Sequence, residues 1–135
     1  MPKLEGSCNC GAISFEITKD NIKAIVNCHC NLCRKRNGAA FSTYVALLDS
    51  GFKLIKGESN ITKYQVSENV HKHFCTTCGT PIYNKSPQYT GITIVHFGAL
   101  NNSDELKPVV NIFCESKLAW VDDITTIESF AKARV

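Results

Sequence analysis

Apolar and polar residues alternate in short runs along most of this chain. In the clearest run, Ile13, Phe15 and Ile17 alternate with Ser14 and Glu16. A period of two residues is typical of a strand with one buried face. Further short segments rich in β-branched and aromatic residues lie at 24–26, 39–48, 52–56, 61–66, 70–74, 80–84, 92–99 and 109–113. Turn residues separate them and no long amphipathic helix intervenes, so the pattern predicts a mainly β fold of about eight or nine strands.

Two segments depart from the strand pattern. Residues 34–37 are predicted to form a single helical turn that ends at Gly38, because glycine commonly closes such turns. Residues 121–133 fit either a strand or a terminal helix, and their periodicity does not decide between the two. The length of 135 residues, with no repeat or linker, predicts a single domain over residues 1–135.

Composition and charge narrow the range of partners. A formal net charge of +3 is too small to demand a polyanionic partner, so we expect no nucleic acid. The sequence shows no signal peptide and no apolar run long enough for a membrane span, so we expect a cytoplasmic protein with no membrane partner. Clustered cysteines in a reducing compartment more often bind metal or react than form disulfides.

The eight cysteines include a dense group in the segment 28–33, where Cys28, Cys30 and Cys33 precede three cations. Thiolates suit zinc, and three of them can hold the metal while leaving a fourth coordination position open. Two outlying pairs supply four more thiols: Cys8 with Cys10, and Cys75 with Cys78. These four would complete a closed structural zinc site.

Spacing alone leaves two groupings of these thiols open. In the favoured one, Cys8 and Cys10 join Cys75 and Cys78, and the 28–33 cluster stands alone. In the other, Cys30 and Cys33 join Cys75 and Cys78 as a ribbon-like site. The gap from Cys33 to Cys75 exceeds the roughly 15–20 residues expected of a zinc ribbon, which favours the first grouping.

Three motifs together resemble the glutathione-dependent formaldehyde-activating enzyme family, which shares its domain with centromere protein V. They are residues 6–12 (GSCNCGA), residues 27–34 (NCHCNLCR) with Gly38, and residues 74–81 (FCTTCGTP). Residues 98–100 and 120–123 also match, so the similarity extends over nearly the whole chain. The resemblance implies a twisted antiparallel β-tent, in agreement with the strand pattern.

The resemblance also implies metals, substrates and an activity. It implies a structural zinc on Cys8, Cys10, Cys75 and Cys78 and a second zinc on Cys28, Cys30 and Cys33. We expect the second zinc to be the more labile one, because three ligands hold zinc less firmly than four. The family's reaction adds the thiol of glutathione to formaldehyde and is classed as a carbon–sulfur lyase reaction. Its partners are a small thiol and a small carbonyl compound.

The residue types fit that chemistry independently. A metal with an open position favours deprotonation of an incoming thiol, and the thiolate can then attack a carbonyl carbon. The guanidinium groups of Arg34 and Arg36 could receive glutathione carboxylates, although a solvated basic turn explains the same residues. A non-catalytic zinc-stabilised binding or scaffold domain is the alternative, and the oligomeric state is not determined by the sequence.

Four further residues receive more ordinary interpretations. His29 is expected to lie behind the metal ligands or at the surface, because both its neighbours are candidate ligands. His71 and His73 share a strand face and are expected to pack or to contact solvent. Cys114 is expected to be a partly buried strand residue. Seven aromatic residues are expected to build the core: Phe15, Phe41, Tyr44, Phe52, Phe74, Phe97 and Phe113.

Overall fold

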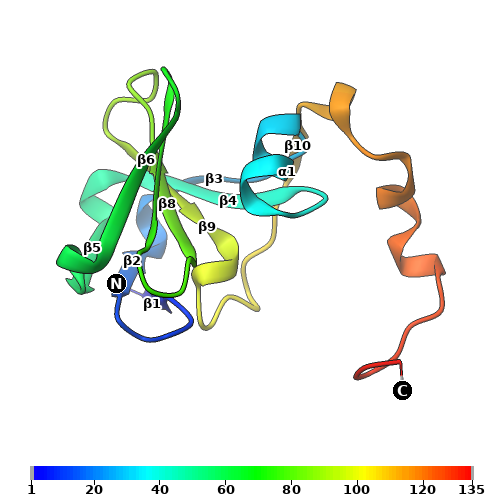
Figure 1. The fold of residues 1–135 in the computed structure, drawn as a ribbon, viewed down its shortest axis with the longest axis horizontal. Coiled ribbons are helices and arrows are strands. Elements are labelled where there is room, and N and C mark those ends of the chain that lie inside the picture. The colour runs from blue at the N-terminus through cyan, green and yellow to red at the C-terminus, as the bar shows by residue number, and fades with distance from the viewer. Residues whose placement is uncertain (1, 135) are drawn as a thin grey trace.

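The structure, a computed structural model, describes residues 2–134 and is dominated by strands (Figure 1). Within these residues one α-helix, α1 (Asn31–Asn37), lies between the third and fourth strands. The strands in chain order are β1 (Lys3–Ser7), β2 (Ser14–Thr18), β3 (Ile22–Cys28), β4 (Ser42–Leu48), β5 (Phe52–Lys56), β6 (Ile61–Ser67), β7 (Val70–Cys75), β8 (Pro81–Lys85), β9 (Ile92–His96) and β10 (Val110–Ile112). The predicted mainly β fold is therefore confirmed.

The strands form two sheets. One has three strands in the order β1-β2-β5, and the other has seven in the order β10-β3-β4-β9-β8-β7-β6. Neighbouring strands pair antiparallel throughout, except that β10 pairs parallel to β3. The parallel pairing brings the segment after residue 109 alongside the strand that leads into the cysteine-rich turn.

The hydrophobic core joins these two sheets. Phe15 and Ile17 of β2 belong to the same buried cluster as Val45 of β4 and Val95 of β9. Val45 and Val95 lie directly opposite each other in the register, so their side chains share one face of the larger sheet. Side chains alternate along a strand, and the neighbouring positions therefore face away from the core. Cys28 and most strand residues that line the cavity described below lie on this second, outer face.

Three features differ from the sequence-based expectations. Strand β1 was not predicted, because only Leu4 of its five residues is strongly apolar. The strand expected over 92–99 ends at His96 and continues as a 3-10 turn over Phe97–Ala99. Phe113 was expected in the core, but it is 56% exposed and has a left-handed φ of 56° at the end of β10.

Of the two elements considered for the C-terminal segment, a helix forms over its first part and no strand forms within its described residues. Residues Ala119–Thr126 form a 3-10 helix, and the segment runs beside the β-sheet body rather than across it (Figure 1, orange to red). Its large apolar side chains are exposed: Trp120, Ile124, Ile127 and Phe130. None of the helices within residues 2–134 combines the length and the apolar character that a membrane crossing requires.

Gly57 lies in the loop after β5, where it packs closely against the backbone of the loop between β1 and β2. Its φ is 94°, and a Cβ built there would lie 2.3 Å from the backbone oxygen of Ala12. Gly57→Ala is expected to lower the free energy of unfolding by roughly 3 kcal/mol, from left-handed strain plus the clash. Chemical denaturation measures this. In the control Gly98→Ala, an added Cβ meets nothing within 4 Å, so stability stays within about 0.5 kcal/mol. Equal stability of the two variants would contradict the prediction.

Candidate metal centres and the adjoining cavity

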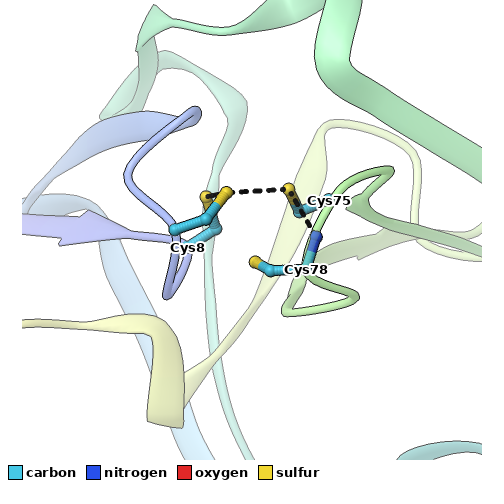
Figure 2. Close-up of side chains that lie close together, drawn as sticks. Cys8, Cys75 and Cys78 are labelled. Carbon is cyan, nitrogen blue, oxygen red and sulfur yellow. Dashed lines mark hydrogen bonds between the residues drawn. The ribbon is translucent and has the colours of Figure 1, made fainter.

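Four cysteine thiols from two distant loops converge at one point. Cys8 and Cys10 lie between β1 and β2, Cys75 ends β7 and Cys78 lies in the turn before β8, with all four sulfurs within 4.8 Å of one another. The sulfurs of Cys8, Cys75 and Cys78 turn toward a common centre (Figure 2). The structure therefore forms the favoured grouping, and the ribbon-like alternative with Cys30 and Cys33 is not formed.

Hydrogen bonds hold these thiols in place. The backbone N–H groups of Ile13 and Cys78 donate to Cys8 Sγ at 3.2 Å and to Cys75 Sγ at 3.4 Å. The Asn60 side-chain amide donates to Cys75 Sγ at 3.2 Å. N–H donors stabilise sulfur in its negatively charged form, which is the form that binds metal.

The second cluster comprises Cys28, Cys30 and Cys33, whose sulfurs also lie within 4.8 Å of one another. Cys28 ends β3, and Cys30 caps α1 by accepting a hydrogen bond from the backbone N–H of Cys33 at 3.2 Å. Gly38 closes α1 in a left-handed conformation, as the sequence predicts. The hydrogen bond with Cys33 lowers the pKa of the Cys28 thiol to about 6. No fourth His, Cys, Asp or Glu ligand joins this cluster within the described residues.

Both clusters fit zinc by the distances between their sulfurs. A tetrahedral zinc with four bonds of about 2.3 Å places its sulfurs about 3.8 Å apart. The sulfur–sulfur distances are 3.6 Å for Cys8–Cys10, 3.7 Å for Cys10–Cys75 and 3.4 Å for Cys28–Cys33. A disulfide would need about 2.05 Å, and all eight cysteines are free thiols. Both groups can therefore hold a metal ion.

A chain of hydrogen bonds connects the second cluster to a buried lysine. The Tyr44 hydroxyl donates to Cys33 Sγ at 3.1 Å, and the Asn37 side-chain amide donates to the Tyr44 oxygen at 3.1 Å. Lys72 Nζ in turn donates to Asn37 Oδ1 at 2.8 Å. Asn37 and Lys72 were not predicted from the sequence as site residues, and Tyr44 was predicted only as a core residue. The only indication in the sequence was Lys72 itself, because it is a charged residue in the segment 70–74 that was predicted to be a strand.

A cavity of about 620 Å³ adjoins the second cluster. Cys28, Cys30 and Cys33 all line it, together with residues from the outer face of the seven-stranded sheet. By contrast, a second cavity of about 360 Å³ near Asp49 and Tyr89 contains none of the cysteines. The three-cysteine cluster therefore opens into a space large enough for a ligand.

The charged residues that line this larger cavity are all cations: Lys23, Arg36, Lys72 and Lys85. Lys72 is buried. Its pKa is lowered mainly by burial and to a smaller extent by the positive charge of Arg36. Nearby His96 is also buried, and its Nε2 donates a hydrogen bond to Asn84 Oδ1 at 2.9 Å. Burial, followed by the charge of Lys72, lowers the pKa of His96 to about 3, so its ring is neutral. The cavity therefore favours an anionic group.

The two arginines considered for substrate carboxylates have different surroundings. The Arg34 guanidinium donates to the backbone oxygen of Ser116 at 2.8 Å and to Asn31 Oδ1, so it ties α1 to the segment after β10. Arg36 lines the cavity, and its guanidinium lies 4.2 Å from the centre of the Tyr64 ring. Of the two, Arg36 is the one placed to meet a ligand.

The histidines outside the clusters have structural contacts. His29 is buried rather than at the surface, with Nε2 3.1 Å from Asn111 Oδ1, so it joins the cysteine turn to β10. His73 packs on the Tyr83 ring, with centroids 4.2 Å apart, and His71 is half-buried. These two agree with their expected packing roles.

Cys114 was expected in a strand and partly buried, and this expectation was wrong. It is exposed and begins a 3-10 turn over Cys114–Ser116, because the left-handed Phe113 ends β10 before it. It belongs to neither cysteine cluster.

Comparisons with known proteins agree with the geometry. The sequence profile of the glutathione-dependent formaldehyde-activating enzyme family matches residues 3–116. A Halomonas elongata protein, provisionally described as a glutathione-dependent formaldehyde-activating enzyme, is 28% identical over 127 residues, which is 88% of this chain and 80% of that protein. A crystal structure of a Rhodobacter sphaeroides protein has a similar fold, with a TM-score of 0.60 and 22% identity over 80% of this chain and 99% of the other.

Proposed function

This chain belongs to the glutathione-dependent formaldehyde-activating enzyme family, and from that premise we propose that it adds a thiol such as glutathione to formaldehyde or another small carbonyl compound. The observation that carries the proposal is the three-thiol cluster at the wall of a cation-lined cavity. A cluster of three thiols leaves a coordination position for substrate, whereas four thiols close the metal off.

Two zinc ions with different roles belong to this proposal. Cys8, Cys10, Cys75 and Cys78 hold a structural zinc, and Cys28, Cys30 and Cys33 hold the second. When bound, the second zinc would lower the pKa of an incoming thiol and supply a thiolate at neutral pH. Free thiol ligands also need a reducing compartment, which supports a cytoplasmic location.

The reaction is balanced without any further reactant. The thiol loses its proton, a carbon–sulfur bond forms, and the π electrons of the carbonyl group move to its oxygen, which takes up one proton. The product is a thiohemiacetal, and the reverse reaction cleaves the carbon–sulfur bond, hence the lyase class.

The chain's own residues bind and orient the reactants. Arg36 would pair with a glutathione carboxylate through its Nη groups. Lys72 has three N–H donors and uses two of them on Arg36 O and Asn37 Oδ1, both at 2.8 Å. Its remaining donor can stabilise the negative charge that develops on the carbonyl oxygen, because a preorganised donor in a buried position requires little rearrangement.

Metal analysis together with an exchange assay tests the function. The metal-replete protein is expected to contain two zinc ions per chain and to accelerate the exchange of formaldehyde with its glutathione adduct, followed by NMR. Mild chelation should remove the second zinc and the activity together, because three ligands hold zinc less firmly than four, and glutathione should slow that loss. One tightly bound zinc with no acceleration would instead support the scaffold alternative.

A further inference from the structure

The cavity beside the three-cysteine cluster has an apolar floor. Val26 lies two residues before Cys28 on β3, so both side chains are on the outer face of the sheet. Val26 pairs with Tyr44, and two residues further along β4, Ala46 pairs with Ile94 of β9. Val26, Ala46 and Ile94 all line the cavity and are half-buried. They form a continuous apolar surface, hereafter the apolar floor.

The apolar floor begins at the cluster and leads away from it. With a rise of about 3.4 Å per residue, Val26 lies about 7 Å along the sheet from Cys28. The Ala46–Ile94 pair lies four residues from Ser42, which is the position opposite Cys28, and is therefore about 14 Å away. Val66 and Val70, from the β6–β7 side, add further apolar lining. A ligand that reacts at the cluster can therefore lie along this floor.

Neither formaldehyde nor glutathione accounts for this surface. Formaldehyde has two non-hydrogen atoms and no apolar chain, and a cavity of about 620 Å³ far exceeds it. Glutathione is polar and carries two carboxylates, which match a cation such as Arg36 rather than three aliphatic side chains. The apolar floor is therefore unexplained if those two molecules are the only reactants.

We propose that the carbonyl substrate is an aldehyde with an apolar chain, which lies over Val26, Ala46 and Ile94 while its carbonyl carbon reaches the three-cysteine cluster. The inference rests on the proposed function and names its substrate class. The chemical step is the same as for formaldehyde. The thiol loses its proton, a carbon–sulfur bond forms to the aldehyde carbon as the carbonyl π bond breaks, and the carbonyl oxygen gains one proton to become a hydroxyl group. The apolar chain is retained.

The test compares two aldehydes and one unreactive probe. We expect kcat/KM divided by the uncatalysed rate constant of the same aldehyde to be at least about tenfold higher for octanal with glutathione than for formaldehyde, the effect of burying about two methylene groups. Calorimetry should also detect binding of 1-octanol, which has the same chain and no carbonyl group. This binding measurement does not depend on turnover.

Variants locate the effect. Ala46→Trp fills the floor and should lower the octanal-to-formaldehyde ratio of kcat/KM and the affinity for 1-octanol at least about tenfold each. Ile55→Trp is the matched control, because Ile55 lies on β5 of the other sheet and is 51% exposed; it should change neither quantity. Ile94→Thr is a milder second variant that keeps the β-branched shape and should shift both quantities in the same direction.

The outcomes separate the two proposals. Turnover of formaldehyde in preference to octanal, with no binding of 1-octanol, would overturn the aldehyde assignment and leave the proposed function intact. Binding of 1-octanol with no turnover of either aldehyde would overturn both and leave an apolar ligand site. A dimer that does not bind 1-octanol would overturn the assignment by making a second copy the occupant of the floor.

Discussion

Cys75→Ser is expected to leave the protein largely unfolded at ambient temperature and without the structural metal proposed above. Cys75 is fully buried, and its cluster joins the β1–β2 loop to the β7–β8 turn, which belong to different sheets. A structural zinc site contributes about 10–16 kcal/mol of binding free energy. The whole stability of a domain is about 5–15 kcal/mol, so losing the site removes as much as the fold possesses.

Metal content and thermal unfolding followed by circular dichroism measure this effect. Cys114→Ser is the matched control, because Cys114 is exposed and lies outside both clusters. It should leave the melting temperature and the metal content unchanged. A Cys75→Ser protein that retained two zinc ions and melted within a few degrees of the wild type would show that the four-cysteine cluster is not a structural metal site.

Cys30→Ser is expected to abolish thiol addition while the protein stays folded. Serine is a poor ligand for zinc compared with a thiolate, so the second metal should be lost. Replacing a residue that only hydrogen-bonds to a metal ligand typically lowers metal affinity or activity about 10–100-fold. Loss of a ligand itself should therefore lower the rate roughly 100-fold or more. Serine is also a favoured N-cap, so its Oγ can keep the hydrogen bond from Cys33 N that begins α1.

The exchange assay and metal analysis decide this prediction. The variant should contain one zinc per chain and unfold cooperatively, well above the melting temperature of Cys75→Ser. Lys35→Gln is the control on the same helix, because Lys35 is exposed and does not line the cavity. If Cys30→Ser kept both zinc ions and the wild-type rate, the three-cysteine cluster would have no part in the reaction.

The fold was predictable wherever strands alternate clearly between apolar and polar residues. Strand β2 shows this best, since Phe15 and Ile17 are buried and their neighbours are not. Strand β1 carries no such signal, because it depends on pairing with β2 and on Gly6, whose missing side chain leaves room for the Phe15 ring. The end of β10 was also not predictable, because phenylalanine rarely adopts the left-handed conformation that Phe113 has.

The candidate site was predictable where its residues are close in sequence. Cys28, Cys30 and Cys33 span six residues, so any compact turn brings their thiols together. The different surroundings of Arg34 and Arg36 were not predictable, because the first faces Ser116 and the second faces Tyr64, two residues that are distant in sequence. Lys72 was missed for the same reason: its partners Arg36 and Asn37 lie on α1.

The sequence by itself determined the strand-rich fold class, the thiols available for metal and the protein family, because these depend on residue identity and local spacing. Only the tertiary structure decided that Cys8 and Cys10 meet Cys75 and Cys78, since strand pairing must close a gap of more than sixty residues. It also decided the character of the cavity. Whether Val26, Ala46 and Ile94 face the core or the cysteine cluster depends on strand register, and a shift of one residue would exchange the two faces.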